Sequence, residues 1–170
     1  MNPIKASLGW SAGTPFVSRT IRRLDRVPGI SPAVNHVYYR FDFPDDGALI
    51  YESHISGGVQ ITPYEHLLSA KVKGIVYYVH EIPLDCDPVL LWNDCIPLHG
   101  KHYDTGQIVR YYLWRRLFRR KNKKILKLFN DDRYTCNEFI ISAGRQVVDA
   151  IAPLDYSYTP NRLLEYFMQL

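Results

Sequence analysis

Hydrophobic residues follow two periods along this chain, and the first is typical of β-strands. Four stretches rich in β-branched and aromatic residues predict strands, at 34–43, 48–54, 59–62 and 74–82. The sequence PDDG at 44–47 separates the first two, and its proline and glycine favour a turn. We therefore expect the first two strands to form an antiparallel hairpin.

The second period is helical. Several stretches repeat apolar residues at helical spacing or begin with a proline or a capping residue, as helix starts do. They predict helices at 15–25, 63–70, 87–98 and 103–118, a helix that begins at Cys136, and a last helix at 159–170. The chain shows no repeat, low-complexity tract or linker. We expect one α+β domain over residues 1–170, with helices packed around a small antiparallel sheet.

The stretch YTCNEFIISAG at 134–144 places a cysteine at the start of a helix. Thr135 and Glu138 make the T-x-x-E pattern of a capping box, so we expect Thr135 to be the N-cap and Cys136 the first helical residue. Backbone amides and the positive end of the helix dipole gather there and stabilise a thiolate. Cys136 is therefore the candidate nucleophile, and a cysteine that only packs in the core is the alternative.

A cysteine nucleophile needs a base, and the base needs a group that orients it. His36 and Tyr38 lie on the more polar face of the strand at 34–43, because side chains alternate along a strand. Glu52 and His54 share one face of the next strand. His36 is the candidate base, Glu52 the candidate third member and His54 its rival. A structural position in a strand is the alternative for each.

The length of the hairpin loop decides whether His36 and Glu52 share a face of the sheet. Paired residues of a hairpin have a constant index sum, and a four-residue loop at 44–47 pairs Phe43 with Ala48, an odd sum. That register puts Glu52 opposite the wrong face. A loop of three or five residues, or a bulge, gives an even sum and brings the two together. The Cys-His-Glu hypothesis therefore demands an even register.

The composition is that of an ordinary folded protein, with 46% hydrophobic and 22% charged residues among 170. No apolar run approaches the roughly 18 residues of a membrane span, and the N-terminal stretch lacks the apolar core of a secretory signal. Three scattered cysteines do not make a disulfide framework. We expect a reducing compartment and a cytoplasmic or phage-associated protein.

The chain has a net charge of +4, and its positive charges are spread unevenly. The segment 105–130 holds nine basic residues and no acidic one. Aromatic and aliphatic residues are interleaved with the charges at roughly helical spacing. The candidate polyanion contacts are Arg115, Arg116, Arg119, Arg120, Lys123 and Lys124. Such a face suits an anionic polymer or membrane surface, and nucleic acid less well, because no nucleic-acid motif accompanies it. A solvated helix face with a basic loop is the alternative.

We expect no cofactor and no metal. Cys86 and Cys95 are nine residues apart, unlike the close pairs of zinc sites. One weak candidate for a metal site stands against the expectation of no metal. It is the cluster of Cys95, His99, His102 and Asp104. The sequence has no glycine-rich phosphate loop and no G-x-S-x-G nucleophile motif.

A series of short motifs runs in order from about residue 10 to about residue 165. They are S-x-x-I-R (Ser18, Ile21, Arg22), H-V (His36, Val37), an acidic strand followed by Gly-Val (Glu52, Gly58, Val59), G-x-x-Y-D (Gly100, Tyr103, Asp104), the nucleophile that opens a helix (Cys136, Glu138) and T-P (Thr159, Pro160). Their order resembles the permuted papain-fold cysteine hydrolases, related to NlpC-type cell-wall peptidases and lecithin:retinol acyltransferase, in the bacterial branch where the histidine precedes the cysteine. Asn137 departs from the pattern, since members often have Ser or Thr after the nucleophile.

The resemblance implies a permuted papain-like fold with Cys136 as nucleophile, His36 as base and Glu52 as third member. His54 is its rival because acyltransferase relatives use a second histidine, and Tyr38 or Tyr134 is a candidate for an extra hydrogen bond. The implied activity is hydrolysis of peptide-like amides, including cell-wall stem peptides, or of esters, through an acyl-enzyme. The alternatives are a lipid acyltransferase or phospholipase, and a non-catalytic module that holds nucleic acid or an anionic partner through the basic segment 107–127.

Overall fold

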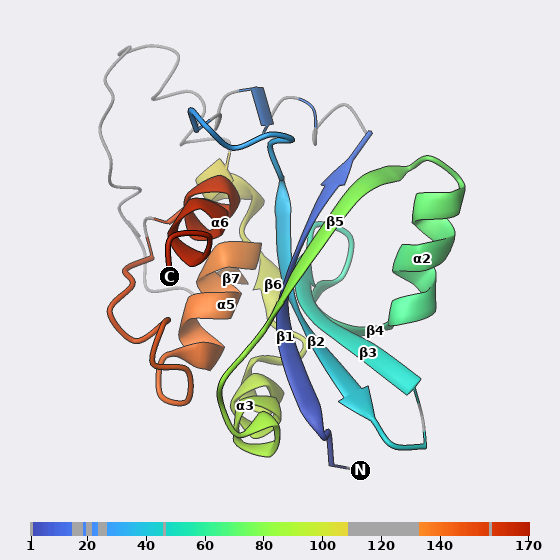
Figure 1. Ribbon diagram of the computed structural model, residues 1–170. Helices are drawn as coiled ribbons and strands as arrows, with labels where there is room; N and C mark the ends of the chain where they lie inside the picture. The colour runs from blue at the N-terminus through green and yellow to red at the C-terminus, as the bar shows by residue number, and fades with distance from the viewer. Residues whose placement is uncertain are drawn as a thin grey trace.

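The computed structural model describes residues 2–14, 19, 22–23, 27–45, 47–108, 133–156 and 158–170. Its main feature is a five-stranded antiparallel sheet with the strand order β4-β3-β2-β1-β5 (Figure 1). The strands are β1 (Lys5–Gly13), β2 (His36–Phe43), β3 (Gly47–His54), β4 (Gly58–Pro63) and β5 (Val76–Pro83). With helices gathered around this sheet, the fold belongs to the α+β class, as expected.

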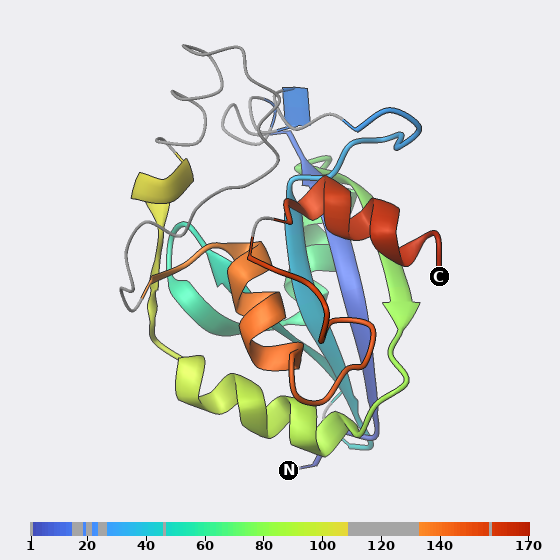
Figure 2. The same cartoon turned by 90° about the vertical axis from the view of Figure 1, so that its left-hand side faces the viewer.

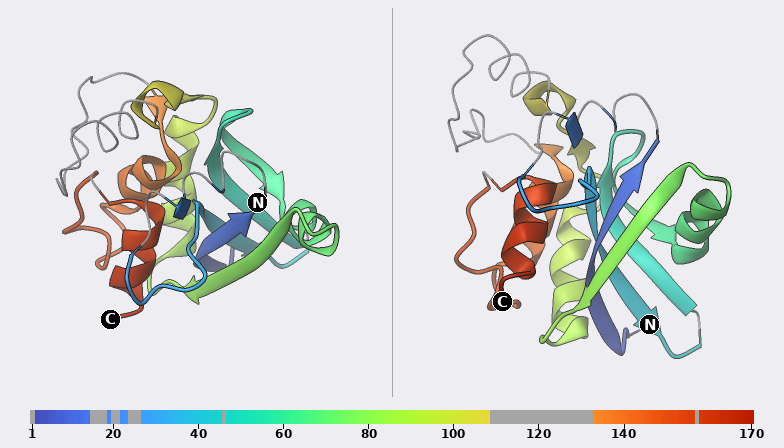
Figure 3. Two further views of the ribbon diagram at one scale, coloured as in Figure 1. Left: turned by 90° about the horizontal axis from the view of Figure 1, so that it is seen from above. Right: turned by 45° about the horizontal axis from the view of Figure 1, so that its top comes forward.

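Helices lie on both sides of the sheet. Figures 1 and 2 show α3 (Pro88–Cys95), α5 (Cys136–Gly144) and α6 (Pro160–Phe167) on one side and α2 (Tyr64–Val72) on the other, an arrangement that Figure 3 also shows. The turn η1 (Ile96–Leu98) continues α3, and the short strands β6 (His102–Tyr103) and β7 (Arg133–Tyr134) pair in parallel just before α5. Among the described residues, no helix has both the length and the apolar character needed to cross a bilayer.

The predicted elements that lie wholly within the described residues have counterparts in the structure. The predicted strands correspond to β2, β3, β4 and β5, and the predicted helices at 63–70, 87–98 and 159–170 correspond to α2, α3 with η1, and α6. Most of the predicted helices at 15–25 and 103–118 lies outside the described residues. Within the second, residues 105–108 are helical, but Tyr103 belongs to β6.

The sequence pattern missed β1, which lies between β2 and β5 in the sheet. Its sequence, KASLGWSAG, is rich in small residues and does not alternate, yet nearly the whole strand is buried. A Cβ atom at Gly9 would overlap the ring of Tyr38 on the neighbouring strand. The small residue therefore makes room for a large cross-strand neighbour, a contact that strand propensity does not reveal.

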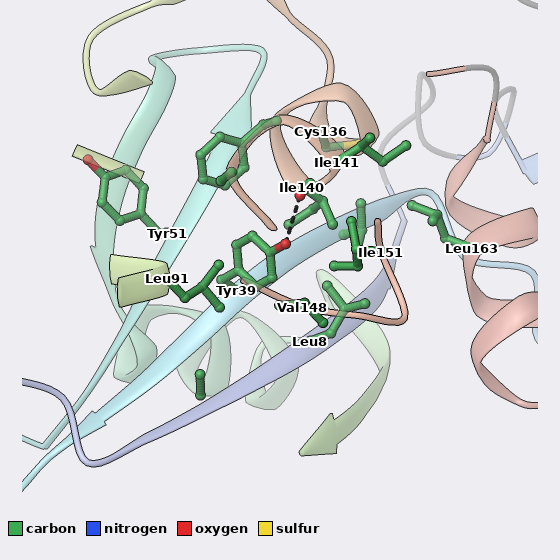
Figure 4. Close-up of a cluster of buried hydrophobic side chains, with 14 of the residues drawn as sticks. Leu8, Tyr39, Tyr51, Leu91, Cys136, Ile140, Ile141, Val148, Ile151 and Leu163 are labelled. Carbon is green, nitrogen blue, oxygen red and sulfur yellow. Dashed lines mark hydrogen bonds between the residues drawn. The ribbon is translucent and has the colours of Figure 1, made fainter. Parts of the chain in front are cut away.

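The core lies between the sheet and the helices α3 and α5 (Figure 4). The hydroxyl of Tyr39 in β2 donates to the carbonyl of Ile140 in α5 at 2.7 Å. Tyr51 in β3 stacks on Phe139 of the same helix, with ring centroids 5.6 Å apart. A Cβ at Gly144 would overlap the Tyr39 hydroxyl, so the glycine lets α5 lie directly on β2. These contacts fix α5 against the sheet.

Candidate active site

The hairpin formed by β2 and β3 has an even register. Phe43 pairs with Gly47 and Tyr38 pairs with Glu52, which leaves a three-residue loop at 44–46. Glu52 therefore shares a face of the sheet with Tyr38 and with His36, the first residue of β2. The Oε2 of Glu52 lies 2.6 Å from the Nε2 of His36. The hairpin therefore has the even register that the Cys-His-Glu hypothesis requires.

The nucleophile candidate lies where the capping box predicted it. Thr135 has an extended backbone and caps α5, and Cys136 is the first residue of the helix and is buried. The amide of Thr135 donates to Oε2 of Glu138 at 3.0 Å. The Oε1 of Glu138 accepts from Nε2 of Gln107, also at 3.0 Å. The buried carboxylate of Glu138 therefore joins the N-cap residue Thr135 to Gln107 at the start of the helix.

The thiol of Cys136 lies close enough to the imidazole of His36 to raise the pKa of that ring. Because Nε2 of His36 is engaged by Glu52, Nδ1 is the ring nitrogen left for the thiol. The start of β2, the middle of β3 and the N-terminus of α5 thus each supply one side chain. The structure brings together the cysteine, histidine and glutamate that the sequence singled out.

The electrostatics of the site favour a charged imidazole. Burial alone lowers the pKa of His36, but its hydrogen bonds to Cys136 and Glu52 and the negative charges of those groups outweigh burial and raise the pKa to about 10. Burial alone raises the pKa of Glu52, but the hydrogen bond and charge of His36, helped by His54 and Thr62, lower it to about 2. Near neutral pH an imidazolium therefore faces a carboxylate.

His54, the rival of Glu52, lies beside His36 without bonding to it. The two rings meet edge to face, with centroids 5.9 Å apart and an interplanar angle of 87°. Nδ1 of His54 lies 2.7 Å from the hydroxyl of Ser56 and accepts from the Ser56 amide at 3.3 Å. Burial and the neighbouring His36 lower the pKa of His54. The geometry therefore favours Glu52 as the group that orients His36.

The two candidate tyrosines are placed differently. The hydroxyl of Tyr38 donates to Oε1 of Glu81 in β5 at 2.9 Å, and burial and the Glu81 charge raise its pKa. It is committed to β5 and not to the thiol. Tyr134 lies in β7, two residues before Cys136, and its carbonyl accepts from the Ser53 hydroxyl at 2.7 Å. Tyr134 therefore joins β3 to the start of α5 through its backbone.

Among the described residues, carboxylates and no histidine affect the pKa of the other two cysteines. Burial, followed by the charges of Asp87 and Asp85, raises the pKa of Cys86 to about 11. Burial, followed by the charge of Asp94, raises the pKa of Cys95 well above its ordinary value. Both therefore stay protonated thiols near neutral pH. Neither has the reactive environment that surrounds Cys136.

Asn161 in α6 is a residue of the site region that the sequence did not single out. Its side chain is fully buried, and its amide pairs with the backbone of Val34, two residues before His36. The Val34 amide donates to Oδ1 at 2.7 Å, and Nδ2 donates to the Val34 carbonyl at 2.8 Å. Asn161 therefore fixes the segment that leads into His36. Nothing local to its sequence indicates this contact, because the partners are 127 residues apart.

The candidate contacts to a polyanion lie outside the described residues. They are Arg115, Arg116, Arg119, Arg120, Lys123 and Lys124. In the part of the chain that the structure does describe, no three His, Cys, Asp or Glu side chains are grouped so that they could hold a metal ion, and the weak cluster around His99 and His102 does not form such a group.

The chain matches no protein-family model and no curated protein. Its function must therefore be inferred from the geometry and chemistry of the residues described above.

Proposed function

We propose that this chain is a thiol hydrolase of the permuted papain-like type, which cleaves an amide or ester bond through Cys136, His36 and Glu52. One observation carries the proposal: an imidazole that contacts a carboxylate at 2.6 Å also lies close to a thiol at a helix N-terminus, close enough for the thiol to raise the pKa of the ring. A nucleophile, a base and a group that orients the base are the parts that covalent acyl transfer needs. The chain order, with the histidine before the cysteine, supports the permuted type.

In the first step, the proton of the Cys136 thiol already lies on Nδ1 of His36, so the nucleophile is a thiolate beside an imidazolium. The thiolate attacks the carbonyl carbon of the substrate, a C–S bond forms, and the π electrons of the carbonyl move onto its oxygen. The backbone amide of Cys136 has no acceptor within its own helix, because it belongs to the first turn. It is therefore the donor that we assign to the oxyanion.

In the second step, the tetrahedral intermediate collapses to a thioester. The imidazolium of His36 gives its proton to the leaving amine or alcohol as the bond to the carbonyl carbon breaks. Water then gives a proton to His36 and attacks the thioester, which releases a carboxylic acid and restores the thiolate–imidazolium pair. Glu52 stays ionised and stabilises the imidazolium in both steps. An alcohol or amine in place of water would make the same site an acyltransferase.

The substrate class that we propose is peptide-like amides, with cell-wall stem peptides as the first set to test. This choice follows from the resemblance of the motif order to cell-wall hydrolases. Activated esters test the acylation step separately, because a good leaving group lowers the demand on substrate recognition.

Replacing Cys136 with alanine should abolish acylation and turnover while the fold stays intact. The experiment treats the protein with a p-nitrophenyl ester and with a panel of peptide-like amides, and detects the acyl adduct on Cys136 by mass spectrometry. We expect an adduct in the wild type and none in C136A. Thermal unfolding checks that both proteins are folded.

C86A is the matched control, because Cys86 is a half-buried cysteine whose pKa is raised by burial and by the charges of Asp87 and Asp85. It should acylate and turn over like the wild type. Turnover that persists in C136A would refute the scheme, and so would an adduct on Cys86 instead of Cys136.

A further inference from the structure

Glu52 uses its two carboxylate oxygens for different partners. Oε2 contacts His36, whereas Oε1 accepts a hydrogen bond from the Thr62 hydroxyl at 3.0 Å and lies 3.4 Å from Nε2 of Gln60. Both of these partners belong to β4, which pairs with β3. Gln60 is the direct register partner of Glu52, and Thr62 lies two residues further along on the same face. A third strand therefore reaches the site through the carboxylate.

The donors and acceptors of this cluster allow one direction only. The Glu52 carboxylate can only accept, and Nε2 of Gln60, which also lies 3.4 Å from the Thr62 hydroxyl oxygen, can only donate. The single hydroxyl proton of Thr62 therefore points to Glu52, while its oxygen accepts from Gln60. The Thr62 hydroxyl and the His36 ring therefore both donate to the Glu52 carboxylate, and the same ring lies close to Cys136.

We propose that Thr62 is a positioning residue that acts on the active site through Glu52, an inference that rests on the proposed function. A glutamate has three rotatable side-chain bonds, so a single bond to His36 would leave the carboxylate able to turn. Threonine is stiff at its first side-chain bond because it is β-branched, and it is anchored on a strand. It therefore fixes Oε1 and keeps Oε2 directed at the imidazole, whose Nδ1 then faces Cys136.

The ionised state of the Glu52 carboxylate also supports a positioning role for Thr62. Burial is the largest effect on the pKa of Glu52 and raises it, whereas His36, His54 and the Thr62 hydroxyl lower it. A donor on Oε1 thus helps to keep Glu52 ionised beside the imidazolium. The two β4 residues differ in their distance from Oε1 of Glu52. The Thr62 hydroxyl lies at 3.0 Å, an ordinary hydrogen-bond length, whereas Nε2 of Gln60 lies at 3.4 Å, which is long. Gln60 is therefore the weaker contributor.

The test is the rate at which iodoacetamide alkylates Cys136 near pH 6.5, the ordinary pKa of histidine. The rate is followed by mass spectrometry of the Cys136 peptide in the wild type and in T62V, T62S and Q60M. Valine keeps the shape of threonine, lacks the hydroxyl and suits a strand. We expect T62V to slow alkylation about three- to tenfold, the worth of one hydrogen bond, and to move its pH midpoint upward. T62S should restore the wild-type rate, and Q60M should have a smaller effect than T62V.

A second background separates positioning from a general structural effect. In E52A there is no carboxylate to hold, so adding T62V should change the alkylation rate no further. A wild-type rate in T62V, or an equal loss in both backgrounds, overturns the positioning role, while the loss caused by E52A itself leaves the proposed function standing. A wild-type rate in E52A overturns the role of Glu52 and, with it, that of Thr62. Thermal unfolding confirms that each variant is folded.

Discussion

At the scale of single residues, the imidazole of His36 is the centre of the site because it lies between the Glu52 carboxylate and the Cys136 thiol. Nε2 contacts the Glu52 carboxylate at 2.6 Å, and the nearby Cys136 thiol also raises the pKa of the ring. The His54 ring contacts the His36 ring edge to face, but its Nδ1 is hydrogen-bonded to Ser56. The two neighbours of His36 on β3 therefore have different roles.

This difference predicts that two matched substitutions affect the alkylation rate of Cys136 to different extents. E52Q removes the charge that stabilises the imidazolium and should slow Cys136 alkylation near pH 6.5 by about tenfold or more, because a hydrogen bond between charged groups is lost. H54Q changes a neighbouring side chain of the same strand and should leave the rate within about twofold of the wild type. The rates are measured on the Cys136 peptide by mass spectrometry. A larger loss in H54Q than in E52Q would make His54 the orienting residue.

How far these residues could be predicted depends on how local their signal is. Cys136 was predicted at a helix start because the capping box of Thr135 and Glu138 lies within four residues of sequence. The pairing of His36 with Glu52 was left open, because it depends on a loop length that the turn residues permit but do not determine. Thr62 carries no signal, since it matters only through the register of a neighbouring strand.

At the scale of elements, the site is assembled where β3 runs beside the start of β2 and the N-terminus of α5. α5 is held on β2 by the bond from Tyr39 to Ile140, and α6 is held to the segment before β2 by Asn161. The first contact places the thiol and the second places the base. The relative position of Cys136 and His36 therefore depends on two helices, α5 and α6, that lie far along the chain from β2.

Replacing Asn161 with alanine should weaken both the fold and the site. The amide and the carbonyl of Val34 would lose their buried partners, so we expect the free energy of unfolding to fall by about 2–4 kcal/mol. The alkylation rate of Cys136 should fall as well, because the segment that leads into His36 is released. Urea unfolding and alkylation are measured together.

The matched control is N93A, which changes an exposed asparagine of α3. It should alter the free energy of unfolding by less than about 0.5 kcal/mol, as surface substitutions usually do. Equal stability of N161A and N93A would show that the contacts of Asn161 do not hold the segment before β2.

The elements themselves were predicted unevenly, for a physical reason. β2, β3 and α6 follow their propensities, with β-branched and aromatic residues in the strands and a Thr159-Pro160 start for the helix. β1 has small residues because its neighbours need the space, as Tyr38 does over Gly9. Packing thus overrode local propensity in a buried strand, which a single sequence does not show.

At the scale of the whole molecule, the ion pair of His36 and Glu52 links the stability of the fold to pH. The pKa of Glu52 is lowered from 4.5 to about 2, so its contribution is present above pH 4.5 and is lost as the pH falls towards 2. The pKa of His36 is raised from 6.5 to about 10, so its contribution is complete below pH 6.5 and is lost as the pH rises towards 10. The pair therefore stabilises the fold most between pH 4.5 and 6.5.

This linkage predicts how the stability difference between the wild type and E52Q varies with pH. The wild type should be the more stable protein by the widest margin between pH 4.5 and 6.5, and the margin should narrow towards both pH 2 and pH 10. Urea unfolding across this range measures the margin. A margin that stays constant with pH would mean that the two groups do not form an ion pair in the folded protein.

The measurement that tests the thiolate–imidazolium pair most directly is the alkylation rate of Cys136 as a function of pH, in the wild type and in H36A. We expect wild-type alkylation to have its midpoint well below about 8.5, the value of an ordinary thiol, and the midpoint to move upward in H36A. Peptide mass spectrometry separates Cys136 from Cys86 and Cys95. A wild-type midpoint near 8.5 that H36A leaves unchanged would mean that Cys136 only packs in the core.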